Sequence, residues 1–160
     1  MTVDLAALLV GERDRLVDDW ARSLGRLLPA FTHRPVHDLT AAGRAVVDGL
    51  VRYLETSEPG VLRTLASHDA VVRLLGAVEF PEVLRSLMAL REQAGRLLEP
   101  QIAGAAAQAR AYGGLVAATD LLLGELARVE QHRRRPAAEV GAAAIDLEQH
   151  LVAETRRALR

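Results

Sequence analysis

The sequence contains no cysteine and only 3% aromatic residues among its 160 positions. The lack of cysteine excludes thiol catalysis, thiolate metal sites and disulfide bonds. The shortage of aromatic and β-branched residues makes strands hard to place. Lysine and asparagine are also missing, so all 20 basic residues are arginine, a usage typical of a GC-rich bacterial genome.

Strong net charge and long apolar runs are missing as well. The formal net charge is −1, which argues against the basic surface that binds nucleic acid. The most apolar stretch, residues 102–126, is interrupted by charged residues such as Arg110 and Asp120, so it does not predict a membrane span. The first residues lack a basic region followed by an apolar run, so we expect no signal peptide and a cytoplasmic location.

The residues that are present favour helices throughout. Half of the chain is hydrophobic, and its alanine, leucine, arginine and glutamate have high helix propensity. A chain of this length is expected to form a single domain, residues 1–160. Apolar residues recur at the helical period between breaks at proline and glycine. The sequence predicts an all-α bundle of about six helices, covering approximately 5–28, 38–54, 61–75, 81–98, 101–131 and 137–159.

The last two predicted helices, 101–131 and 137–159, together cover more residues than any other two consecutive predicted helices. The first half of 101–131 is rich in alanine and glycine, so another helix backbone can approach closely there. The arginines at 133–135 complement the dipole of a helix C-terminus, and Pro136 is expected to separate the two helices. We expect a homodimer formed through these helices, with residues 136–160 serving as a signalling or dimerisation helix.

No pattern in the sequence predicts catalysis or a metal site. A glycine-rich phosphate loop and a Gly-x-Ser-x-Gly turn are both absent. His33 and His37 are four residues apart, but Pro35 lies between them and prevents a regular helix with two ligands on one face. No histidine has a glutamate three residues before it, which argues against a di-iron bundle. We therefore expect no enzyme activity, no metal and no cofactor.

Two polar residues occupy positions in apolar stripes. His68 falls in the stripe of residues 61–75, and Arg91 falls in the stripe of residues 81–98. A buried guanidinium needs a carboxylate, backbone carbonyls or a bound anion. The two residues are therefore expected either to form a hydrogen-bonded core pair or to line a pocket for a small molecule or anion. The candidate ligand-binding residues are His68, Arg91, Trp20 and Tyr112.

The residues Ser67-His68-Asp69 resemble the Ser-His-Asp/Glu motif on the phosphorylated helix of histidine kinases. The residues that follow differ from that motif, and no nucleotide-binding segment is present in the 160 residues. Phosphotransfer through His68 is nevertheless an alternative function from a different class.

Two segments carry a family resemblance: HDAVVRLLG at 68–76 and EVLRSLMALR at 82–91. They resemble the N-terminal sensory domain of RsbT co-antagonist proteins of the RsbRD type. The shared features are a histidine with a nearby arginine, a glycine eight residues later, and a helix that ends in Leu-Arg. Trp20 with a leucine four residues on is similar to the opening of that family, and the similarity spans about residues 8–98.

The resemblance implies a globin-like helical fold that generally binds no heme, is dimeric, and acts as a signal-input module. In that family the output is provided by stressosome domains, histidine kinases or transcription regulators. We therefore expect a non-catalytic bacterial sensory domain that relays a ligand or partner signal to an output domain. The alternative within the same fold is a heme-binding globin sensor with His68 as the proximal ligand.

Overall fold

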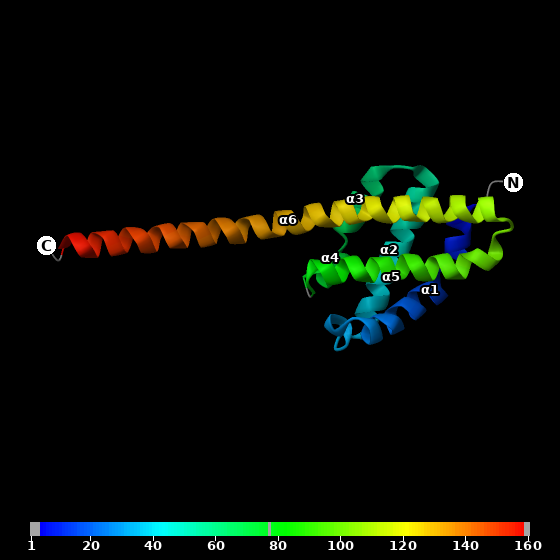
Figure 1. The fold of residues 1–160 in the computed structure, drawn as a ribbon, viewed down its shortest axis with the longest axis horizontal. Coiled ribbons are helices and arrows are strands. Elements are labelled where there is room, and N and C mark those ends of the chain that lie inside the picture. Colours follow the sequence, from blue (N-terminus) through cyan, green and yellow to red (C-terminus); the bar gives the residue numbers. More distant parts are fainter. Residues whose placement is uncertain (1–3, 77, 159–160) are drawn as a thin grey trace. The chain divides into compact units, whose positions relative to one another are not determined.

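The computed structural model describes residues 4–76 and 78–158, and for Leu75 and residues 135–158 it describes the backbone alone. Within those ranges the regular structure is entirely helical (Figure 1), which confirms the all-α prediction. The elements are α1 (Leu5–Leu27), η1 (Pro29–Phe31), α2 (Val36–Thr56), α3 (Pro59–Ala66), α4 (Asp69–Leu75), α5 (Phe80–Leu98), η2 (Glu99–Gln101) and α6 (Ala105–Ala158), where η marks a short 3-10 helix.

The chain divides into two compact units. The first unit, Met1–Ala127, contains α1 to α5 and the beginning of α6, and the second unit is Arg128–Arg160. The signalling or dimerisation helix that the sequence predicts over residues 136–160 has its side chains outside the described residues. The core and the candidate site discussed below both belong to the first unit.

Several helix boundaries lie where the sequence predicts them. Asp4 caps α1 by accepting a hydrogen bond from the backbone N–H of Ala7 at 3.0 Å. The α2 helix ends at Thr56, and Ser57 follows in the left-handed conformation with a φ of 58°. Pro59 and Pro81 stand in the first turns of α3 and α5, where a missing N–H costs no helical hydrogen bond. Proline and polar residues therefore mark these boundaries, whereas α2 begins at Val36, two residues before the predicted start, and has no side-chain cap.

The predicted helix over 61–75 is wrong, because the structure has two short helices there. The chain breaks at Ser67 and His68 between α3 and α4. His68 has an extended backbone, and its Nδ1 accepts a hydrogen bond from the N–H of Ala70 at 3.3 Å. This local bond offers the backbone an alternative to a continuous helix, as short polar side chains often do.

The two helices predicted over 101–131 and 137–159 also differ from the structure. The helix begins at Ala105 and runs through Pro136 to Ala158. It starts later than predicted because Glu99–Gln101 forms η2 and Gly104 takes a φ of +88°. The predicted end before Pro136 is wrong. Strong helix formers, arginine and alanine, flank the proline on both sides and favour helix at the cost of one backbone hydrogen bond.

Trp20 lies at the centre of the first unit and connects three helices. Its side chain, on α1, is 1% exposed. The indole N–H donates to the backbone carbonyl of Ser86 on α5 at 2.7 Å. On α2, Gly43 faces the ring so closely that an added Cβ would lie 2.8 Å from it. The absence of a side chain at position 43 therefore lets α2 approach α1.

We predict that Gly43→Ala destabilises the protein by about 1–3 kcal/mol, since the new methyl group overlaps a rigid, fully buried ring. Gly11→Ala is the matched control, because Gly11 lies within α1 and has nothing within 4 Å of its added Cβ. That control should gain about 0.5–1 kcal/mol from lower backbone entropy in the unfolded chain. Urea unfolding measures both values, and equal stabilisation by the two substitutions would contradict the packing described here.

Candidate functional site

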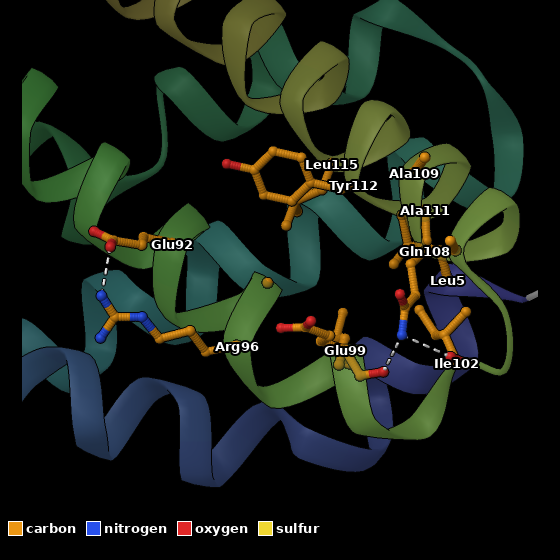
Figure 2. A pocket seen from close by; sticks show the side chains of 13 residues that line it. Leu5, Glu92, Arg96, Glu99, Ile102, Gln108, Ala109, Ala111, Tyr112 and Leu115 are labelled. Carbon is orange, nitrogen blue, oxygen red and sulfur yellow. Dashed lines mark hydrogen bonds and ion pairs between the residues drawn. The ribbon is translucent and has the colours of Figure 1, made fainter.

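A cavity of about 440 Å³ lies where the end of α5, the η2 turn and the beginning of α6 meet the first turn of α1 (Figure 2). This volume is in the range of small-molecule sites. The apolar part of its lining comes from all four elements and includes Leu5, Leu98, Ile102, Ala111 and Leu115. The last four of these side chains are buried or nearly so, so the cavity rests directly on the hydrophobic core.

A side chain of α6 bonds the turn beneath the cavity. The amide nitrogen of Gln108 donates to the backbone carbonyls of Glu99 at 3.1 Å and Ile102 at 3.0 Å. Carbonyls after the end of a helix otherwise have no helical partner. Because Gln108 stands on α6 and Glu99 follows α5, this pair of bonds fixes how the two helices meet. The cavity wall is therefore held in place without a ligand.

An aromatic ring and charged groups form the mouth of the cavity. Tyr112 is 49% exposed, and its ring lies against Gly95, where an added Cβ would be 3.1 Å away. Arg96 forms an ion pair with Glu92 one turn earlier on α5. In the part of the chain that the structure describes, the Glu99 carboxylate has no hydrogen-bond or ion-pair partner. The lining includes no serine, threonine, cysteine or histidine.

The four candidate residues from the sequence do not share this site. Tyr112 lines the cavity, whereas Trp20, Arg91 and His68 do not. Trp20 is a core residue, and its one polar atom is already bonded to Ser86. The sequence therefore identified one of the lining residues.

The predicted position of His68 in an apolar stripe is wrong. The side chain is exposed, since the break after α3 moves it out of the helical pattern and makes it the cap of α4. The expectation of a proximal heme ligand rested on that apolar position. Among the described side chains, His33, His37, His68 and His132 are all exposed, so none of these four faces a buried apolar pocket.

The geometry of His68 also bears on phosphotransfer. Its exposed ring is accessible to a partner, but Nδ1 accepts the N–H of Ala70. A neutral imidazole that accepts at Nδ1 carries its proton on Nε2. Neither nitrogen then has a free lone pair to attack a phosphoryl group while the cap is formed.

Arg91 has the carboxylate partner that its charge requires. Its guanidinium lies 3.1 Å from Asp120 on α6, and the two side chains are 18% and 61% exposed. The pair therefore lies at the edge of the domain, and the expected position of Arg91 inside the core is wrong. The buried stripe of α5 runs through Val83, Leu87, Leu90, Ala94 and Leu98, so its centre is turned away from position 91.

Sequence reasoning missed Glu99 and Gln108. Pro100 and Gly104 do signal a turn between two helices, and polar residues beside such a turn are natural candidates to satisfy its carbonyls. The contact between Gly95 and Tyr112 has no local signal, because it depends on how two helices pack.

Comparison with known proteins gives no match: no protein-family model fits the chain, and no curated protein or solved structure is significantly similar. Among the described residues, no helix is long and apolar enough to cross a membrane. Within the same residues, no group of three or more histidine, aspartate or glutamate side chains is placed to hold a metal ion. The interpretation of the cavity rests on its own residues.

We predict that His68 acts as a helix cap. His68→Ala should lower the stability by about 0.5–1 kcal/mol, whereas His68→Asp should retain or increase it, because aspartate is a stronger N-cap. Urea unfolding of the two variants tests this role. Equal stabilities for alanine and aspartate at this position would show that the Ala70 bond contributes nothing.

Proposed function

We propose that this protein is the non-catalytic signal-input domain of a bacterial regulator, and that it works as a homodimer in the cytoplasm. The observation that supports the proposal is that α6 both lines the cavity and continues into the second unit of the chain. Its first turns supply Gln108, Tyr112 and Leu115 to the cavity wall, and the same helix continues to Ala158 in the second unit of the chain. A ligand that contacts α6 thus acts on the segment that leads to the end of the chain.

The resemblance of segments 68–76 and 82–91 to RsbT co-antagonist sensory domains supports the same proposal. It would place an output domain or a partner protein downstream of the signal. The all-α fold agrees with the globin-like helical domain that the resemblance implies. The lining of the cavity agrees with a binding function, since it offers apolar walls and few polar groups.

Exposed apolar residues on α5 support the homodimer. Leu84 and Met88 lie one helical turn apart and are 36% and 47% exposed. Adjacent exposed apolar side chains favour a protein interface. In the last segment, the apolar residues are spaced by four, three, four and seven residues, which is the pattern of a coiled-coil seam: Val140, Ala144, Leu147, Leu151 and Ala158.

The proposed mechanism is a small shift of packed helices. The cavity lies between the end of α5 and the beginning of α6, so a ligand favours one spacing of these helices over another. Such shifts of one to two ångströms at subunit interfaces are a common form of signalling. The ligand changes the equilibrium only by the difference in its affinity for the two arrangements.

The exposed ring of His68 favours phosphotransfer as a second candidate function. Phosphoramidate, a small phosphoryl donor, provides a direct test, with His68→Ala as the control. Our proposal predicts no added phosphate by mass spectrometry, since Nδ1 is engaged by Ala70. Stable phosphorylation that is lost in His68→Ala would favour the second candidate.

We predict that the protein is a dimer at micromolar concentration and that Met88→Arg makes it monomeric, because the substitution places an unpaired charge on an apolar interface. Val36→Arg is the matched control, as Val36 is 60% exposed on α2. Light scattering coupled to size exclusion measures the mass of each. A monomeric wild type would overturn the homodimer, and a dimeric Met88→Arg would remove α5 from the interface.

A further inference from the structure

The cavity at the η2 turn has apolar walls and a mouth lined by charged side chains. Three charged side chains line it: Glu92, Arg96 and Glu99. Arg96 is paired with Glu92, and its side chain is 73% exposed. In Figure 2 these two side chains extend toward each other, while Glu99 lies between them and Gln108. One carboxylate therefore remains without a cation.

The remaining polar atoms of the lining are mostly acceptors. The amide nitrogen of Gln108 already donates to the backbone carbonyls of Glu99 and Ile102. Its side-chain carbonyl oxygen is left to accept a hydrogen bond. The Glu99 carboxylate only accepts. The Tyr112 hydroxyl can do either, and the face of its ring attracts cations. The mouth of the cavity is thus matched to a positively charged donor.

Anions and fully apolar molecules fit this site less well. An anion would face the unpaired Glu99, and the one arginine nearby is already neutralised by Glu92. A fully apolar molecule would cover the Glu99 and Gln108 oxygens without bonding them, and a buried acceptor without a partner costs about 1–3 kcal/mol.

We propose that the cavity binds a small amphipathic cation, with an apolar body against Leu98, Ile102 and Leu115 and an ammonium group between Tyr112 and Glu99. This inference rests on the proposed signal-input function and gives that function a ligand class. The ammonium group offsets the charge of Glu99, and the apolar body fills a space of about 440 Å³.

Three probes with the same eight-carbon tail test the proposal: octylammonium, octanol and octanoate, each used below its micelle concentration with the full-length protein. Titration calorimetry gives the affinity, and the rise in Tm gives an independent measure of binding to the folded state. We expect octylammonium to bind most tightly and octanoate least. Equal binding of octanoate and the ammonium probe would overturn the proposal.

Variants then locate the site. Glu99→Gln and Tyr112→Leu should each weaken binding of octylammonium by about two- to fivefold, the range for a partly exposed ion pair or cation–π contact. Glu55→Gln is the matched control, since Glu55 is an exposed carboxylate of α2 that does not line the cavity. Ala109→Phe, which fills the cavity mouth from α6, should abolish binding.

Binding that is unchanged in Glu99→Gln and Ala109→Phe would also overturn the proposal, because the probe would then bind elsewhere. A dimeric protein that binds none of the probes would refute the cation site and leave the signal-input function standing. A monomeric protein that binds the ammonium probe would support the cation site and refute the homodimer of the proposed function.

Discussion

The position of Trp20 is the constraint on which the rest of the first unit depends. Its ring requires a glycine on α2, and its indole N–H donates a hydrogen bond to the backbone carbonyl of Ser86 on α5 at 2.7 Å. With so few aromatic residues, this side chain holds both α2 and α5 against α1. Two walls of the cavity follow from that arrangement, since Leu5 comes from α1 and Leu98 from α5. Packing at the centre of the domain therefore sets the shape of a site at its edge.

The cavity adds a second, local constraint to that packing. Gly104 allows the chain to reverse after η2, and Gln108 holds the turn by two hydrogen bonds to carbonyls. These bonds join the end of α5 to the start of α6 at the point where Glu99 and Tyr112 flank the opening. A molecule bound there meets a preformed wall, which lowers the entropic cost of binding. It also contacts both helices, as a signal-input function would require.

The sequence predicted features that depend on local chemistry and missed those that depend on competition between local and tertiary effects. Proline and the polar break at residues 56–60 identified the ends of α1 and α2 and the start of α5, because these signals act within one turn. Asp38, expected as the N-cap of α2, lies inside that helix, which begins at Val36. His68 was misplaced because a hydrogen bond to Ala70 outweighed the helical pattern. Arg91 was placed too deep because one helix face contains both core and edge positions, and its partner Asp120 is 29 residues away in the chain. The site could be recognised in part through Tyr112, whereas the Gly95 contact that positions its ring has no signal in sequence spacing.

We propose that ligand binding at the junction of α5 and α6 is coupled to association of two chains. Sedimentation equilibrium measures this directly as the Kd of the dimer, with and without saturating octylammonium. Coupling free energies between sites are typically about 1–3 kcal/mol, so this coupling should change the Kd of the dimer by at least about fivefold. An unchanged Kd at a concentration that saturates the cavity would contradict it.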